Sequence, residues 1–327
     1  MEISWITVEG HRVARMLGPT VTASVDVDRG AHIFELVDLG SGTNVLYRDP
    51  RGLVDHVVGG WYSLFPNAGP ACVVGGRPIP RHGDVRNLAW DVLDEIATAS
   101  ACGLRVHVTS QCLPLALTRT ILLTDSTLEV SEVVTNEGDT TQTYLLGHHI
   151  TFGSPFVDGA RIEVPSDDVV SRDEFAPPPS VVVAGDVGHP LGSLPGTSGH
   201  LDLTTFPPAP AAEMLFARTL EAPYFEVRAR DGLTFRATWD PTAFPALWIW
   251  IENRGTQAQP FGGTCAGLAL EPQSSHIPSL RAAAEANLAP ILGPGEMRTS
   301  WVRASLFRRP PTTGTPTTEG SAFADDV

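Results

Sequence analysis

A strict alternation of apolar and polar residues runs through residues 225–239 and leaves little choice of secondary structure there. The segment is FEVRARDGLTFRATW, and the alternation continues on both sides of Asp231-Gly232. Successive side chains of a β-strand point to opposite faces, so this pattern predicts two strands with one buried and one solvated face. Asp-Gly is a favoured tight turn between paired strands. The segment therefore predicts an antiparallel hairpin.

Similar β patterns recur along the chain. Residues 21–27 alternate in the same way, and residues 117–134 contain two β-rich runs separated by a turn at Asp125-Ser126. The apolar run 247–251 (LWIWI) is typical of a strand buried on both faces. Convincing helical sequence is confined to a short stretch around 280–288. We therefore predict an all-β fold with very little helix, in which strands recur at the spacing of a sandwich.

The chain is expected to form a single domain over residues 1–307. Residues 176–212 are rich in proline and glycine, which predicts a long irregular excursion rather than a linker between two domains. Residues 308–327 contain few side chains that could enter a core, so we predict a disordered tail there. The 42% of hydrophobic residues leaves ample material for one large core.

Composition argues against several classes of partner. Lys and Arg number 22 against 37 Asp and Glu, a net charge of −15, which disfavours a nucleic-acid binder. No apolar run approaches the roughly 18 residues of a membrane-spanning helix, and the N-terminal segment lacks the pattern of a secretory signal, so we expect a cytoplasmic protein. Four cysteines without CxxC spacing predict reduced thiols rather than a disulfide or zinc framework: Cys72, Cys102, Cys112 and Cys265.

Histidines occur in two contexts that the β pattern does not explain. His82 lies in the loop segment RPIPRHGDV, where it is either a surface histidine or a site residue. His148 and His149 lie between apolar residues on a predicted strand, so they must face opposite sides of the sheet. Both could be hydrogen-bonded structural histidines, since a neutral imidazole is buried at little cost when its nitrogens have partners.

Glu271 is the third unusual position. It follows the apolar run GLAL and precedes Pro272. Glutamate is rarely fully buried, so this carboxyl either reaches water at the end of its strand or has a raised proton affinity. The second alternative is one way in which proteins make catalytic acids and bases.

Taken together, these segments resemble the aldose 1-epimerase, or galactose mutarotase-like, superfamily, in a divergent YeaD-like or DUF4432-like branch. The resemblance spans about residues 61–307, and it depends on four fragments in the family's order: RHGDVRNLAW at 81–90, GHHITF at 147–152, LALEPQSSHIP at 269–278 and GPGEMRTSWVRASLF at 293–307. It implies a large antiparallel β-sandwich, the β-supersandwich of galactose mutarotase-like proteins. One departure is that Ile150-Thr151 replaces the family's usual Pro-Tyr.

The resemblance also implies roles for particular residues. The catalytic acid falls on His149, the catalytic base on Glu271 and a substrate-polarising histidine on His82. The substrate-binding positions that it suggests are Arg86, Trp61 and Asp240. The implied partner is a small sugar, with no cofactor and no metal, and with a monomer and a homodimer both left open.

Acid/base chemistry suits these residue types. Opening a sugar ring requires a base for the O1 proton and an acid for O5, and we expect Glu271 as carboxylate and His149 as imidazolium in these roles. Two alternatives stay open: a non-catalytic carbohydrate-binding module of the same fold, and a metal-dependent isomerase or lyase. The latter would use His82, His149 and Glu271 as ligands.

Overall fold

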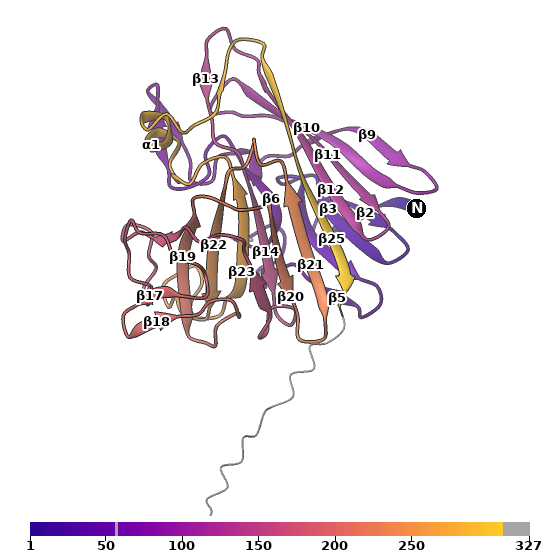
Figure 1. The fold of residues 1–327 in the computed structure, drawn as a ribbon. Helices are drawn as coiled ribbons and strands as arrows, with labels where there is room; N and C mark the ends of the chain where they lie inside the picture. Colours follow the sequence, from indigo (N-terminus) through magenta and orange to yellow (C-terminus); the bar gives the residue numbers. More distant parts are fainter. Residues whose placement is uncertain (56–57, 310–327) are drawn as a thin grey trace, which may run out of the picture.

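The computed structural model describes residues 1–55 and 58–309 and consists of facing antiparallel sheets (Figure 1). Within the described residues the larger sheet has eleven strands, in the order β1-β2-β3-β4-β6-β14-β23-β22-β19-β16, with β5 paired to β4. Its strands are β1 (Glu2–Val8), β2 (His11–Leu17), β3 (Val21–Asp26), β4 (His32–Asp38), β5 (Thr43–Asn44), β6 (Gly60–Leu64), β14 (Gly147–Gly153), β16 (Val169–Ser171), β19 (Ala211–Ala217), β22 (Ala246–Asn253) and β23 (Ala266–Gln273).

The second sheet covers one face of the first. In the described part of the chain it has eight strands, in the order β15-β20-β21-β25-β12-β11-β10-β9. These strands are β9 (Asp91–Ala97), β10 (Cys102–Thr109), β11 (Leu115–Thr124), β12 (Thr127–Asn136), β15 (Arg161–Glu163), β20 (Tyr224–Arg228), β21 (Leu233–Trp239) and β25 (Met297–Arg308).

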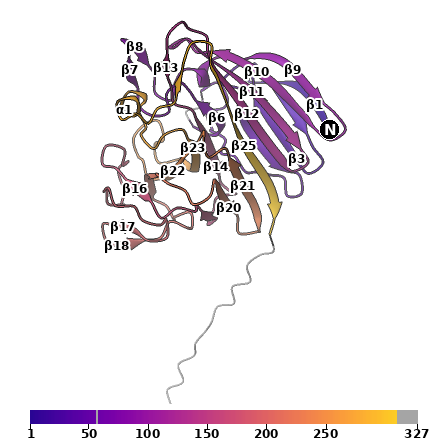
Figure 2. The same ribbon diagram turned by 45° about the horizontal axis from the view of Figure 1, so that its top comes forward.

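Smaller elements gather mostly at one end of the sheets. Figure 2 shows α1, β7, β8 and β13 close together at that end. The small elements are β7 (Cys72–Val74), β8 (Arg77–Ile79), a 3₁₀ turn (Val85–Asn87), β13 (Gln142–Thr143), β17 (Leu194–Gly196), β18 (Gly199–Leu201), α1 (Leu280–Glu285) and β24 (Ile291–Leu292). No helix among the described residues is long and apolar enough to cross a membrane.

The all-β prediction is confirmed, and so are its individual elements. The 225–239 segment forms the β20–β21 hairpin, in which Phe225 is opposite Ala237. The patterns at 21–27, 117–134 and 247–251 correspond to β3, the β11–β12 hairpin and β22. The predicted helix exists but is short, and the proline-rich excursion contains the small β17–β18 hairpin before β19 begins.

The predicted tail boundary is close to the end of the last strand. β25 runs through Arg308, whose guanidinium contacts Asp38 and Asp231 at 3.0 Å each, so Arg308 belongs to the sheet. The rest of the predicted tail beyond Arg309 lies outside the described residues.

Aromatic side chains join the two sheets in a common core. Phe152 of β14 packs on Phe235 of β21, with ring centroids 4.7 Å apart, and on Phe225 of β20. All three side chains are fully buried. Because β14 lies near the middle of the larger sheet, its inward face belongs to this core and its outward face is free to form a site.

Candidate active site

The alternation of β14 separates its two histidines. β14 pairs with β6 on one side, with His148 opposite Ser63 and His149 opposite Tyr62. His148 points toward the second sheet, where it lies 3.1 Å from Glu132 of β12. His149 points away from that sheet. The prediction that the two imidazoles face opposite sides is therefore confirmed.

The outward imidazole of His149 meets Glu271 of β23. The pairing of β14 with β23 places these residues on the same face, and His149 Nε2 lies 3.4 Å from Glu271 Oε1. Both side chains are almost completely buried, with exposed fractions of 6% for His149 and 2% for Glu271. An acid/base pair predicted from segments more than a hundred residues apart is thus in contact.

Aromatic rings hold His149 on two sides. Tyr62 stacks on the imidazole, with centroids 5.0 Å apart and an interplanar angle of 12°. Trp250 of β22 lies 6.3 Å away on the same outward face. The guanidinium of Arg86 packs over the Tyr62 ring at 4.4 Å, which places a cation near the stack. These contacts leave the His149 ring little freedom to rotate.

His82 approaches the same imidazole from a loop that follows β8. The two rings lie edge to face with centroids 6.2 Å apart. His82 has a positive φ of 64°, and Gly83 after it has a φ of 70° and packs so tightly on Phe65 that a Cβ would lie 1.8 Å from the Phe65 carbonyl oxygen. Glycine is therefore required at position 83.

The hydrogen bonds of His82 define its tautomer. Nδ1 lies 2.6 Å from the carbonyl oxygen of Ala68, so this nitrogen carries the proton and donates it. Nε2 accepts a hydrogen bond from Arg81 Nε at 3.1 Å, which requires a free lone pair there. His82 is a neutral imidazole in this arrangement. Burial and the charges of Arg86 and Arg81 accordingly lower the pKa of His82 to about 3.

Burial also governs the protonation of the His149–Glu271 pair. Desolvation raises the pKa of Glu271 to about 8, offset only in part by the hydrogen bond that Gln273 Nε2 donates at 3.0 Å. Desolvation, with the neighbouring His82, lowers the pKa of His149 well below its usual range. At neutral pH the proton of the pair therefore resides on Glu271 and His149 is neutral. This distribution is the reverse of the one expected from the sequence.

Two of the suggested substrate-binding residues do not reach this site, which corrects the sequence-based assignment. Trp61 is fully buried on the opposite face of β6, where its Nε1 donates to His148 Nδ1 at 3.0 Å. Asp240 caps a turn by accepting the backbone N–H of Thr242 at 2.9 Å. That turn carries Phe244, which packs on His148 and not on His149. Both assignments fail because strand alternation and turn capping place these side chains elsewhere.

Two residues at the site were not predicted from the sequence. Tyr62 and Trp250 lie on the outward face, in β6 and β22, and their strands looked like plain core sequence. Their place at the site follows from the strand register, which puts Tyr62 directly opposite His149. Sequence alone gives no register between strands so far apart.

The same geometry offers little to a metal ion. Among residues 1–55 and 58–309, no three His, Cys, Asp or Glu side chains converge closely enough to hold one. His82 uses Nδ1 on a carbonyl oxygen and Nε2 on Arg81, so neither nitrogen is available as a ligand. The metal-dependent alternative receives no support from this arrangement. The four cysteines are free thiols in the described structure.

The architecture is that of galactose mutarotase-like proteins. A solved structure of a galactose mutarotase-like protein from Clostridium acetobutylicum superposes with a TM-score of 0.70 at 16% identity, covering 94% of this chain and 99% of the other. A candidate aldose 1-epimerase from Escherichia coli K12 gives 0.66 at 20% identity, covering 91% and 99%. YeaD, a candidate mutarotase from Salmonella typhimurium, gives 0.66 at 14% identity, covering 94% of each chain.

These likenesses define the fold. The resemblance stated from the sequence fragments is confirmed at that level, because proteins of the mutarotase-like and YeaD types share the whole β-sandwich with this chain. No protein-family model matches the chain, and neither does any curated protein sequence. At identities of 20% and below, activity has to be argued from the site itself.

Proposed function

We propose that this chain is an aldose 1-epimerase-like isomerase that interconverts the anomers of a free sugar. The observation that carries the proposal is the direct contact of His149 Nε2 with Glu271 Oε1, 3.4 Å apart on the outward face of the larger sheet. Buried imidazole and carboxyl groups in contact form a unit that can give one proton and accept another. The mutarotase-like fold supports a sugar as the substrate class.

The reaction needs one proton donor and one proton acceptor, and this pair provides both. Ring opening moves the O1 proton to a base, breaks the C1–O5 bond and delivers a proton to O5, giving an open aldehyde. Rotation about C1–C2 and closure on the other face of the carbonyl reverse these transfers. One proton enters the sugar as another leaves, so the pair still holds a single proton after the ring has opened.

The resting protonation state assigns the first transfers. With the proton on Glu271, this carboxyl acts as the acid toward O5 and the neutral His149 acts as the base toward O1. The assignment derived from the family resemblance is the other tautomer of the same pair. Because mutarotation runs in both directions, each group serves once as acid and once as base in a full cycle.

Residues around the pair would orient the sugar. His82, Arg81 and Trp250 are the more exposed groups at this face, so the substrate approaches from their side. Arg86 is held against Tyr62 at 4.4 Å, where its charge can stabilise negative charge that develops on O1. Trp250 offers an aromatic face for the C–H surface of the sugar.

Removing the acid tests the proposal. Glu271→Gln keeps the size of the side chain and its neighbour Gln273, but it cannot transfer a proton. We expect the rate of anomer exchange to fall about 10²–10⁴-fold, as measured by polarimetry or by NMR exchange on fresh α-anomers of hexoses and pentoses. The matched control is Glu252→Gln, a buried glutamate on β22 that caps the backbone of residues 255 and 256.

Two outcomes would contradict the proposed activity. If the wild-type protein leaves every sugar at its spontaneous rate, the chain is not an epimerase of those sugars. Binding of a sugar without any rate enhancement would instead identify a carbohydrate-binding module of the same fold.

A further inference from the structure

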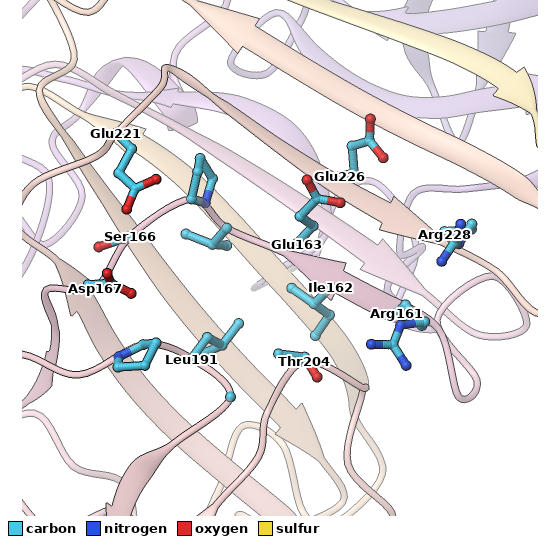
Figure 3. Close-up of a pocket in the computed structure, with 14 residues that line it drawn as sticks. Arg161, Ile162, Glu163, Ser166, Asp167, Leu191, Thr204, Glu221, Glu226 and Arg228 are labelled. Carbon is cyan, nitrogen blue, oxygen red and sulfur yellow. The ribbon is translucent and has the colours of Figure 1, made fainter.

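A cavity lies in a part of the molecule away from the His149–Glu271 pair. It has a volume of about 410 Å³ and is formed by β15, β20 and the loop around Leu191 (Figure 3). Neither His149 nor Glu271 lines it. Its volume is within the range of small-molecule sites, so it is large enough for a compact ligand.

Two arginines lie side by side at one end of this cavity. Arg161 of β15 is directly opposite Arg228 of β20 in the strand register, and Figure 3 shows the two side chains adjacent. Like charges in directly opposed positions destabilise a sheet. Within the described part of the chain, neither guanidinium has an ion-pair partner within 4.0 Å.

Glu226, the carboxylate on the same strand as Arg228, is already engaged. Its Oε1 accepts hydrogen bonds from Arg236 Nη1 and Arg309 Nη2, each at 2.8 Å. Glu226 is 97% shielded from solvent, so its charge is matched in place by these two partners. Glu226 therefore pairs with Arg236 and Arg309 rather than with Arg228.

Two other nearby carboxylates accept hydrogen bonds from neutral groups. Glu163 accepts a hydrogen bond from the Tyr224 hydroxyl at 2.6 Å. Asp202, which is close enough to Arg161 for the arginine to lower its pKa, is turned to Thr204 and accepts both the backbone N–H and the hydroxyl of that residue. Glu163 and Asp202 keep their negative charge, but among the described residues neither forms a salt bridge with Arg161 or Arg228.

The opposite end of the cavity has a different character. Asp167 and Glu221 lie there beside Ser166, and Figure 3 shows them well apart from the arginines. Ile162 and Leu191 are buried and lie between the two ends. A ligand that spans the cavity meets cationic donors at one end and hydroxyl-accepting oxygens at the other.

We propose that this cavity binds a small polyhydroxylated anion, with its carboxylate or phosphate group between Arg161 and Arg228 and its hydroxyl groups toward Asp167 and Glu221. Arginine pairs match such oxyanions because each guanidinium presents two parallel N–H groups. The bound anion relieves the repulsion between the opposed arginines. The site is independent of the proposed sugar isomerisation, since no residue is shared.

Calorimetric titration of the full-length protein tests the site with three probes: D-glucuronate, inorganic phosphate and D-glucose. We expect glucuronate to bind wild type and D-glucose not to bind at this site. The double variant Arg161→Gln/Arg228→Gln should weaken glucuronate binding about tenfold or more. The charge-matched control is Arg105→Gln/Arg303→Gln, which removes two exposed arginines of β10 and β25 and should leave binding unchanged.

The phosphate titration distinguishes the two kinds of anion. Tighter binding of phosphate than of glucuronate, lost in the double variant, assigns the site to phosphate esters, whereas the opposite order assigns it to sugar acids. A comparison with Glu271→Gln separates this site from the isomerase site. The proposal is wrong if glucuronate and phosphate both fail to bind wild type, or if the arginine double variant binds them as wild type does while still folding by circular dichroism.

Discussion

His148 and His149 are adjacent on β14, and each lies beside a buried glutamate of another strand. His148 Nε2 is 3.1 Å from Glu132 in the second sheet, and His149 Nε2 is 3.4 Å from Glu271 in the same sheet. All four side chains are nearly inaccessible to solvent. The two carboxyls nevertheless differ widely, with a pKa of about 2 for Glu132 and about 8 for Glu271.

The difference comes from the partners rather than from the burial. Desolvation alone would raise the pKa of Glu132, but His148 and the buried Arg119 outweigh it. Arg119 Nε donates to Glu132 Oε1 at 3.0 Å, and Ser63 donates to the same oxygen. Among the described residues, Glu271 accepts a side-chain hydrogen bond from the amide of Gln273 alone, and this bond offsets only part of the effect of desolvation on its pKa. His148 and Arg119 together thus keep Glu132 ionised, whereas Glu271 holds its proton.

Among these variants, Glu132→Gln should lower the free energy of unfolding the most, because it removes the carboxylate from a buried ion pair. It leaves Arg119 and His148 buried without a carboxylate, a change that typically costs about 3–5 kcal/mol in the free energy of unfolding. Urea denaturation at pH 7 measures it.

The matched control for Glu132→Gln is Glu129→Gln on the same strand. Glu129 pairs with the half-exposed Arg303 at 2.7 Å, so its loss should cost less than about 1 kcal/mol. Equal losses for both variants would show that Arg119 and Glu132 contribute no more than a surface pair. The folded pKa of Glu132 is depressed, so its contribution should be present above about pH 4.5 and fade as the pH falls toward 2.

Glu271→Gln should have the opposite pH signature. The folded pKa of Glu271 is raised from 4.5 to about 8, so the folded wild-type protein loses stability as the pH rises through this window. The variant lacks this titration. Its stability relative to wild type should therefore increase by up to about 1.4 kcal/mol per pH unit, or up to about 3 kcal/mol between pH 6 and pH 8.

Denaturant titrations at several pH values measure this slope. A stability difference that stays flat from pH 6 to pH 8 would mean that Glu271 is already ionised in the folded protein. The proposed resting state, with the proton on Glu271, would then be abandoned.

Gln273→Met should produce the smallest effect, a shift in the pH dependence of catalysis. The single-proton pair is lost when Glu271 ionises, so we expect the exchange rate to decline above about pH 8. The amide of Gln273 lowers the pKa of Glu271 by donating to Oε2, and methionine removes that bond at similar volume. The alkaline limit should move up by about 0.5–1 pH unit, as followed by NMR exchange from pH 6 to pH 10.

A downward shift, or no shift with an unchanged rate, would contradict this role of Gln273. The matched control is Gln257→Met, since in the described part of the chain Gln257 Nε2 donates to the loop carbonyls of residues 254 and 255 and lies away from the site.

The sequence predicted the elements of the fold better than the members of the site. Alternation and turn residues locate the β20–β21 and β11–β12 hairpins, because these depend on neighbours in the chain. His149 and Glu271 were found from their polar character in apolar strands and from the family fragments. Trp61 was misassigned because its facing depends on where β6 pairs with β14, and no local pattern encodes that register.

The protonation of the site was also beyond the sequence. Whether a buried glutamate is an ion or an acid depends on the cations around it, and Arg119 is 152 residues from Glu271 in the chain. The local sequence left open whether Glu271 reaches water at the end of its strand or has a raised proton affinity, and the family resemblance implied a carboxylate. The packing shows that Arg119 forms its ion pair with Glu132 and not with Glu271.

The adjacency of the two histidines makes β14 intolerant of length changes. A slip of one residue against β6 and β23 in one direction would bring His148 opposite Glu271 and Gly147 beside Glu132, and a slip in the other direction would bring His149 beside Glu132 and Ile150 opposite Glu271. Either slip leaves one of the two glutamates without an imidazole, and Gly147 leaves the position where a Cβ would lie 1.8 Å from Gln273 Oε1. An insertion or deletion just before this strand, where Tyr144, Leu145 and Leu146 are buried, should therefore disrupt the chemistry of the site as well as its packing.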